Sequence, residues 1–364
     1  MLNYNNPQLV IESAKAKEGK ITWRSPSNIA IIKYWGKHGI QLPRNPSISF
    51  TLENAYSETT LAYRPKDVDS SYNEISMNFI FDRNPNEQFK NKTVKFFESI
   101  LDIFPFLKQF HFDITSRNSF PHSAGIASSA SGMSALSLCI CSLEHKYFNT
   151  LDDDAAFRQK ASFVSRLGSG SACRSIYPGM ALWGESPEWT GSSDLYAIPV
   201  DDTHEVFKSY HDDILIVSKG EKSVSSRAGH GLMDENIYAD NRYKQAKNRL
   251  RNLKSILQQG DVEAFGKIAE SEALVLHALM MSSNPPYILI KPNTLLMIEK
   301  IHHFRKEMKV PLYFSLDAGP NLHLLYPDEV KTQVQEFITS ELLPHCENGQ
   351  WIKDKVGRGP LQMD

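Results

Sequence analysis

The stretch from Pro121 to Ser134 constrains the fold more than any other part of this 364-residue chain. A turn that contains Gly125 leads into Ser128 and Ser129, and apolar residues then recur three to four positions apart, which predicts a helix over 129–147. A helix that begins with small polar residues presents unpaired N–H groups and the positive end of its dipole to an anion. Taken alone, the stretch is compatible both with an ordinary capped helix and with a phosphate site.

The other predicted elements mix strands and helices without regular strand–helix–strand alternation, which favours an α+β fold over a doubly wound sheet. Strands are predicted at 21–35 (with a polar turn at 25–28), 47–64 (a strand pair), 75–81, 110–116, 179–183, 213–218, 312–316 and 322–326. Helices are predicted at 94–103, 129–147, 152–167, 234–258, 261–281, 292–308 and 330–343. The length allows two domains, and we place their boundary near 200–210.

The charge balance argues against nucleic acid as a partner, because such binding needs a basic face and this chain has a net charge of −2. Its four cysteines match no zinc or disulfide framework, which is typical of free thiols in a reducing cytosol. No segment reaches the ~18 uninterrupted apolar residues of a membrane span, and the N-terminus lacks the apolar core of a signal peptide. We therefore expect a cytoplasmic protein that binds neither nucleic acid nor membranes.

A lysine pair is the first candidate for chemistry. Lys33 ends a run of four apolar residues, and Lys37 follows it across Gly36. An apolar strand seldom carries a lysine unless that side chain reaches water, a partner or a ligand. The segment is compatible with a strand end that carries two solvated lysines, and equally with two cations directed at an anionic ligand.

Two further segments carry charged groups in turns. A second glycine- and serine-rich loop runs from Gly168 to Ser175 and contains Arg174, whose guanidinium suits a carboxylate or a phosphate. Asp317 ends an apolar strand in a turn that contains Gly319 and Pro320. Both segments also have plain structural interpretations, a short capped helix for the first and an Asx turn for the second.

Together with the hydroxyls and arginine of Ser223–Arg227, these segments supply two candidate anion sites, several cations and one carboxylate. The cations are those of Lys33, Lys37, Arg174 and Arg227, and the carboxylate is that of Asp317. Such a set suits phosphoryl transfer between two polyanions, which depends on positioning and charge neutralisation more than on covalent help from the protein.

These motifs, in this order, resemble those of the diphosphomevalonate decarboxylase family, within the superfamily of galactokinase, homoserine kinase, mevalonate kinase and phosphomevalonate kinase. The segments that carry the resemblance are Asn28–Lys37, Gly125–Ala130, Ser169–Ser175, Asp317–Asn321 and 356–360. They span roughly residues 21 to 360, so the resemblance covers nearly the whole chain.

The resemblance implies a two-domain small-molecule kinase fold with the active site in the cleft between the domains. Residues 1–205 are expected to form a ribosomal-protein-S5-domain-2-like half that binds ATP. Residues 206–364 are expected to form a ferredoxin-like half that carries the catalytic aspartate, with a C-terminal tail that packs back on the cleft. Relatives form homodimers, so a homodimer is expected here too.

The activity implied is the ATP-dependent decarboxylation of (R)-5-diphosphomevalonate to isopentenyl diphosphate in the mevalonate pathway, with release of ADP, phosphate and CO₂. By the resemblance, Asp317 is the base or orienting group at the 3-hydroxyl, Lys33 stabilises charge near the reacting oxygen, and Arg174 holds the substrate carboxylate. The implied substrate-binding residues are Tyr34, Trp35, Gly36, Lys37, Ser169, Gly170, Ser171, Ala172, Cys173, Ser226 and Arg227. The implied ATP-binding residues are Gly125, Ala127, Ser128 and Ser129, and Ser128 or Ser129 would meet Mg²⁺ at the ATP phosphates.

Three positions depart from the family pattern, which leaves the phosphorylation state of the substrate open. His122 places an imidazole beside the first serine motif, Gln88 stands where some relatives carry arginine, and Arg227 stands where others carry threonine. The alternatives are a decarboxylase of 5-phosphomevalonate, an enzyme that only phosphorylates the 3-hydroxyl, and a non-catalytic ATP-binding regulatory relative. The polar stretch Pro65–Asn73 is a candidate lid over ATP.

Overall fold

The computed structural model describes residues 3–66, 74–121, 126–220 and 224–363. The strands are β1 (Gly19–Ala30), β2 (Lys37–His38), β3 (Leu42–Pro43), β4 (Ser47–Pro65), β5 (Ser76–Phe81), β6 (Asn84–Pro85), β7 (Phe110–Asn118), β8 (Met180–Trp183), β9 (Ala197–Val200), β10 (His211–Leu215), β11 (Tyr313–Leu316), β12 (Leu322–Tyr326), β13 (Trp351–Ile352) and β14 (Leu361–Met363). The α-helices are α1 (Glu87–Ser99), α2 (Ser128–Phe148), α3 (Asp154–Gly168), α4 (Ser226–Gly231), α5 (Ala239–Gln259), α6 (Val262–Met281), α7 (Pro292–Met308) and α8 (Lys331–Phe337). A 3₁₀ helix, η2 (Gly170–Ile176), follows α3.

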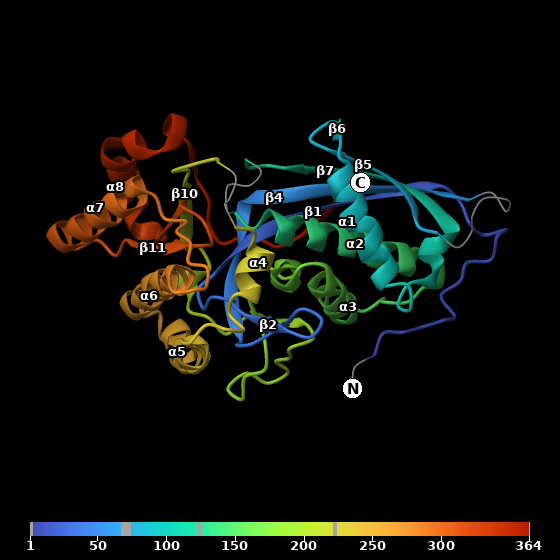
Figure 1. The fold of residues 1–364 in the computed structure, drawn as a ribbon, viewed down its shortest axis with the longest axis horizontal. Coiled ribbons are helices and arrows are strands. Elements are labelled where there is room, and N and C mark those ends of the chain that lie inside the picture. The colour runs from blue at the N-terminus through green and yellow to red at the C-terminus, as the bar shows by residue number, and fades with distance from the viewer. Residues whose placement is uncertain (1–2, 67–73, 122–125, 221–223, 364) are drawn as a thin grey trace.

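Two groups of elements lie side by side (Figure 1). One contains the long strands β1 and β4 with helices α1, α2 and α3, and the other contains β10 and β11 with α5 to α8. The short helix α4 lies between the two groups (Figure 1). Among the described strands, β5 and β7 pair in parallel with α1 between them in the chain, and the other pairings are antiparallel. Strands and helices thus mix without regular strand–helix–strand alternation, so the predicted α+β class is confirmed. None of the helices in the described parts of the chain combines the length and apolar character needed to span a bilayer.

The first sheet has the order β14-β1-β4-β7-β5-β6, and β8 and β9 continue it from the beginning of β4. The predicted strand pair at 47–64 is wrong, because β4 is a single strand that pairs with β8 at its beginning and with β7 at its end. From Ala55 to Tyr63 its residues alternate between buried and half-buried, as expected for a strand with one face on the core.

The predicted turn at 25–28 is also wrong, because these residues lie inside β1, where the register with β4 shifts between Pro26 and Asn28. Proline lacks the N–H that a regular ladder requires, which makes an irregular position suitable for it. On the opposite strand, the N–H groups of Glu53, Asn54 and Ala55 are bonded to the carboxylate of Asp354 instead. A residue near the C-terminus of the chain therefore accepts the N–H groups that the irregular pairing leaves without a strand partner.

The helices of the first group were predicted with good bounds at α2 and α3, whereas α1 starts earlier than the predicted 94–103. The side chain of Asn86 caps α1 by accepting the N–H of Phe89, and this cap defines the start. Helix α2 packs against β1 and β4, and α3 packs against α2. The predicted loop at 168–175 is largely the 3₁₀ helix η2.

The second sheet has the order β11-β12-β10-β13, all antiparallel, and α6 packs against β11. Predicted strands at 213–218, 312–316 and 322–326 correspond to β10, β11 and β12. An apolar cluster joins the two groups, since it contains Ile29 and Phe50 from the first sheet together with Ile214 from the second sheet and Phe265 from α6. Burial of each such side chain stabilises the fold by roughly 1.5–3 kcal/mol, and the cluster fixes the two sheets relative to each other.

The C-terminal segment connects the two sheets. β13 pairs with β10, and β14 then pairs with β1 at the edge of the first sheet. None of the described residues from 351 to 363 lines the cavity described below, and the packing of the tail on the cleft stays a prediction. Because β9 ends at Val200 and β10 begins at His211, we propose that the domains divide between residues 205 and 206.

Candidate active site

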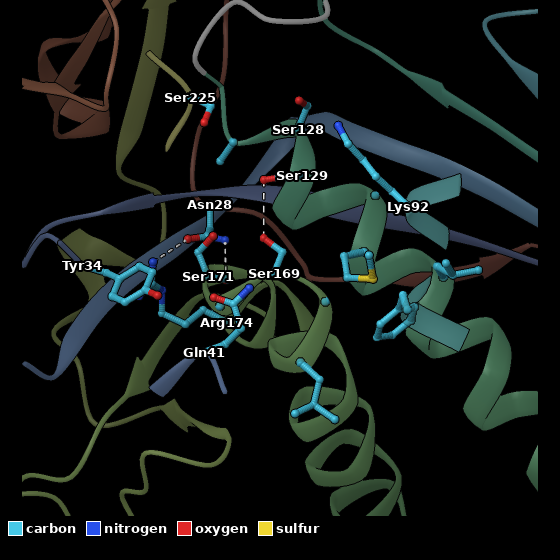
Figure 2. Close-up of a pocket in the computed structure, with 18 of the residues that line it drawn as sticks. Asn28, Tyr34, Gln41, Lys92, Ser128, Ser129, Ser169, Ser171, Arg174 and Ser225 are labelled. Atoms are coloured by element: carbon cyan, nitrogen blue, oxygen red, sulfur yellow. Dashed lines mark hydrogen bonds between the residues drawn. The ribbon is translucent and has the colours of Figure 1, made fainter. Parts of the chain in front are cut away.

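A cavity of about 830 Å³ opens where the two groups of elements meet, and Figure 2 shows part of its lining. Most of the residues singled out from the sequence line it. They are Lys33, Tyr34, Trp35, Lys37, Ala127, Ser128, Ser129, Ser169, Gly170, Ser171, Arg174 and Asp317. The structure thus brings segments that lie far apart in the sequence to one cavity.

An ion pair between Lys33 and Asp317 lies in this cavity. Nζ of Lys33 donates to Oδ1 of Asp317 over 3.0 Å. The Lys33 side chain is only 2% exposed, whereas that of Asp317 is 24% exposed. Lys33 follows β1 in the N-terminal half, and Asp317 lies in the turn between β11 and β12 in the C-terminal half. The pair therefore joins the two halves, with its carboxylate on the side that a ligand can reach.

The turn that carries Asp317 is held by its own polar groups. The side chain of Asn321 accepts the N–H groups of Val217 and Ser218, which follow β10. Thr294 at the start of α7 donates to the carbonyl of Pro320. These bonds fix the turn to its neighbours, so that Asp317 is placed by a rigid connection.

Arg174 lies in η2 with its side chain fully buried. Its Nη1 donates to the hydroxyl of Ser47 over 2.7 Å, and its Nη2 donates to Oδ1 of Asn28 over 3.3 Å. Burial lowers the pKa of this guanidinium, although it stays a cation at neutral pH. Among the described residues, Nε of Arg174 has no hydrogen-bond partner. An unpaired buried donor costs about 1–3 kcal/mol, so this N–H is suited to an acceptor supplied by a ligand.

The segment after Lys33 is held by His230, a residue that the sequence interpretation missed. His230 lies on α4, lines the cavity, and packs between the rings of Tyr34 and Trp35 at 4.3 and 4.6 Å. Its Nδ1 accepts the N–H of Gly36 over 3.0 Å, so in the neutral ring Nε2 carries the proton. Burial, and then the nearby charge of Lys37, lower the pKa of His230 to about 3. A lone histidine after a serine motif gives no signal of this kind in the sequence.

Two hydroxyl-bearing segments meet on one side of the cavity. Ser128 and Ser129 begin α2, and Ala127 before them has a left-handed backbone with φ of 45°. Ser169 donates from its hydroxyl to that of Ser129 over 3.4 Å, and Figure 2 shows the two side chains directed at each other. The start of α2 and the start of η2 thus form one polar wall of the cavity.

Beyond α2 the cavity continues into an apolar region with two cations, which the sequence interpretation also missed. Its rings belong to Phe79, Phe81, Phe89 and Phe96, and the cations are Lys92 and Lys95. Lys92 extends from α1 toward the end of α2 that carries Ser128 (Figure 2). These residues come from β5 and α1, where aromatic spacing alone is typical of a core.

Some candidates are not brought to the cavity. Ala172 and Cys173 are fully buried and do not line it. Burial raises the pKa of the Cys173 thiol to about 12, and its Sγ donates to the carbonyl of Gly170. Their side chains belong to the buried part of η2, and their contact with substrate stays a prediction. Gln88 is exposed on α1 and also lies outside the lining.

Other candidates are only partly described. Lys37 donates to Oε1 of Gln41 over 3.0 Å. Ser226 and Arg227 begin α4, next to Ser225, which lines the cavity, while their side chains lie outside the described part of the structure. Gly125, His122 and residues 67–73 of the candidate lid also lie outside the described residues.

Family models match both halves of the chain. A model of the diphosphomevalonate decarboxylase-like N-terminal domain matches residues 25–197, and a model of the mevalonate 5-diphosphate decarboxylase C-terminal domain matches residues 213–360. The diphosphomevalonate decarboxylase of Debaryomyces hansenii is 30% identical over 321 residues, which is 85% of this chain and 80% of that protein. The chain belongs to the diphosphomevalonate decarboxylase family.

Solved structures of diphosphomevalonate decarboxylases share the fold. The mevalonate diphosphate decarboxylase of Staphylococcus aureus superposes with a TM-score of 0.81 at 26% identity, covering 96% of this chain and 99% of that one. A second structure, described as MDDEF in complex with MVAPP, AMPPCP and magnesium, gives a TM-score of 0.78 at 27% identity, covering 95% and 99%. The family relationship suggested by the sequence motifs is therefore confirmed over nearly the whole chain.

Proposed function

We propose that this protein is an ATP-dependent diphosphomevalonate decarboxylase, which converts (R)-5-diphosphomevalonate and ATP to isopentenyl diphosphate, ADP, phosphate and CO₂. The observation that carries the proposal is the Lys33–Asp317 pair, which lies in one cavity with Arg174 and with the hydroxyls at the start of α2. The related complex with MVAPP, AMPPCP and magnesium supports mevalonate diphosphate, ATP and Mg²⁺ as the small molecules involved.

The first step is transfer of the γ-phosphoryl group to the 3-hydroxyl of the substrate. The hydroxyl oxygen forms a bond to phosphorus, and the bond from phosphorus to the ADP oxygen breaks. The hydroxyl proton passes to Asp317, or to a phosphate oxygen where Asp317 only orients the hydroxyl. Lys33, 3.0 Å from Asp317, stabilises the negative charge that develops on the reacting oxygen. Preorganised charges of this kind are a large source of rate enhancement.

The second step breaks two bonds at once or in succession. The 3-phosphate leaves with the electrons of its C–O bond, and the electrons of the bond to the carboxylate carbon form the new double bond as CO₂ departs. Arg174 would hold the carboxylate through Nε, the N–H that lacks a partner among the described residues. The substrate then supplies the acceptor that this buried donor lacks.

ATP would lie along the wall formed by the start of α2. The backbone and hydroxyls of Ser128 and Ser129 suit its phosphates, because a helix N-terminus attracts anions. Lys92 and Lys95 add positive charge, and the phenylalanine-lined region suits the base. Hydroxyl oxygens are ligands that Mg²⁺ accepts, so Ser128 or Ser129 fits a Mg²⁺ ion carried by the phosphates. The metal would neutralise phosphate charge.

The remaining polar residues would hold the substrate diphosphate. Tyr34, Trp35 and Lys37 line the cavity, with Gly36 beside them in the chain, as do Ser169–Ser171. Ser226 and Arg227 begin α4 directly after Ser225. We further propose a cytoplasmic homodimer. The cytoplasmic assignment is supported by the four cysteines, all of which are unpaired and buried, and the homodimer by the family relationship.

A steady-state assay of CO₂ release with 5-diphosphomevalonate and with 5-phosphomevalonate tests the proposal. We expect the diphosphate to be preferred in kcat/KM. A preference of about tenfold or more for the monophosphate, equal to about 1.4 kcal/mol, would show that the substrate is wrong. Phosphate transfer without CO₂ would indicate a 3-kinase, and no ATP turnover with any mevalonate phosphate would indicate the non-catalytic relative.

A further inference from the structure

Helix α6 contacts both members of the Lys33–Asp317 pair, although neither residue belongs to it. Oε2 of Glu272 accepts the backbone N–H of Lys33 over 2.8 Å. Nε2 of His277 lies 3.1 Å from the backbone carbonyl oxygen of Asp317. Because a carbonyl oxygen only accepts, His277 donates in this bond. Glu272 and His277 are five positions apart, which corresponds to about 7.5 Å along a helix axis.

The contact to Lys33 is reinforced by Arg242 from α5. Arg242 forms a bidentate ion pair with Glu272, with Nη1 2.8 Å from Oε1 and Nη2 2.5 Å from Oε2. Nη2 of Arg242 also donates to the carbonyl oxygen of Lys33 over 3.1 Å. The peptide groups on both sides of the Lys33 Cα are therefore bonded to one ion pair, and that ion pair belongs to the other half of the molecule.

Glu272 and Arg242 are almost completely withdrawn from water, with side chains 0% and 2% exposed. Burial alone raises the pKa of Glu272, but Arg242, Arg249 and the Lys33 N–H outweigh it and lower that pKa below its usual value. The carboxylate thus stays charged. A buried ion pair is often no more stabilising than apolar residues of the same size, so stability alone explains its presence poorly.

We propose that α6 sets the separation of Lys33 and Asp317, with Glu272, Arg242 and His277 as positioning residues for the reaction. The hydrogen bonds described above reach backbone atoms of Lys33 and Asp317, so they act on where the two residues lie. The helix spans the junction between the two halves. It holds Lys33 of the N-terminal half through Glu272, and Asp317 of the C-terminal half through His277. This inference rests on the proposed function, since it assumes that Lys33 and Asp317 act in catalysis.

His277 gives the milder test, because its replacement leaves the Glu272–Arg242 ion pair intact. His277→Leu removes the donor to the Asp317 carbonyl, whereas His277→Gln retains an N–H at a similar distance along the side chain. We expect His277→Leu to lower kcat about tenfold with KM for both substrates within about twofold, and His277→Gln to recover most of this. Equal kcat in the wild type and His277→Leu would overturn the role of His277.

Glu272 has a matched control on the same helix. Glu270, two residues earlier, pairs with Arg305 of α7 at 2.7 Å and does not touch Lys33 or the cavity. We expect Glu272→Gln to lower kcat about tenfold or more beyond any change in Glu270→Gln, measured below the unfolding transition of each variant. Equal losses in the two variants would show a general structural effect and overturn the proposal for Glu272. Should Glu272→Gln not fold, the His277 pair of variants decides.

A double-mutant cycle separates this inference from the proposed function. If α6 acts through Asp317, the kcat loss of His277→Leu should largely disappear in an Asp317→Asn background, because the aligned carboxylate is already absent. Additive losses would overturn the inference. The proposed function fails separately: it is wrong if the wild-type protein releases no CO₂ from mevalonate phosphates, or if Asp317→Asn turns over like the wild type.

Discussion

The two walls of the cavity are built differently. The N-terminal wall contains short runs of lining residues after Lys33, at the start of α2 and at the start of η2. From the C-terminal half, the lining contains Asp317 with Ala318 from a turn, Ser225 and His230 at α4, and Leu276 of α6. The first wall offers hydroxyls and helix N-termini, whereas the second offers one carboxylate, one hydroxyl and one neutral imidazole.

The difference shows how each wall obtains its precision. Consecutive residues at a helix start are held by the helix itself, since the backbone geometry orients every N–H. Isolated side chains need long-range support, and here Asn321 holds the turn of Asp317, while Glu272 holds Lys33 from across the domain junction. We therefore expect replacement of Asp317 to affect the reaction steeply, and replacement of a single hydroxyl at the start of α2 to affect binding in a smaller step.

The largest effect is expected from Asp317→Ala. Removing one preorganised charged group at the reacting atoms should lower kcat roughly 10²–10³-fold or more. The measurement is ATP-dependent CO₂ release at saturating substrates, with unfolding followed in parallel to exclude loss of the fold. Turnover like that of the wild type would remove Asp317 from the mechanism.

Arg174→Ala should come next, with substrate KM and kcat both impaired and kcat/KM lowered by about 10²-fold, because a hydrogen-bonded charge pair to the carboxylate is lost. His122→Ala, which changes a residue outside the described structure, should be milder. Measuring kcat and KM of both variants with ATP and 5-diphosphomevalonate checks that the loss is greater in Arg174→Ala than in His122→Ala. A greater loss in His122→Ala would mean that this imidazole has a catalytic role.

Ser129→Ala should have a smaller effect, since one neutral hydroxyl contributes about 0.5–1.5 kcal/mol. We expect the KM for ATP to rise about three- to tenfold while kcat changes little. Ser142→Ala on the same helix is a matched control, because its hydroxyl accepts from the Trp23 ring and lies outside the cavity. A fold-decrease in kcat in Ser129→Ala that exceeds the fold-increase in KM would contradict the expectation that this hydroxyl acts mainly in ATP binding.

The smallest effect on activity, but a specific one on stability, is expected from acidification. The pKa of His230 is about 3 in the folded protein, whereas an unfolded histidine takes up a proton near pH 6.5. Between these values the unfolded chain binds more protons, so stability falls as the pH drops from about 6.5 toward 3, by up to about 1.4 kcal/mol per pH unit.

His230→Phe should reduce that slope. Thermal unfolding between pH 7.5 and 4.5 measures it, with His303→Phe, an exposed histidine on α7, as the control. Parallel pH profiles of the wild type and His230→Phe would contradict the assignment of a neutral buried ring.

Much of the fold followed from local patterns. The apolar spacing of α2, α3 and α6 and the short apolar runs of β10, β11 and β12 predicted elements close to those observed. The errors at 25–28 and 47–64 arose where a distant residue, Asp354, bonds the N–H groups of an irregular strand. No local window contains that partner, so the polar residues there resembled a turn.

The sequence alone determined the family, the α+β class and the motifs that line the N-terminal wall, because these properties reside in consecutive residues and their spacing. Only the tertiary structure decided that Lys33 meets Asp317, that His230 lies between Tyr34 and Trp35, and that Glu272 and His277 of α6 hold the catalytic pair. The physical reason is that these contacts join segments about 40 to 280 residues apart, whose meeting depends on the packing of two sheets around a shared apolar cluster.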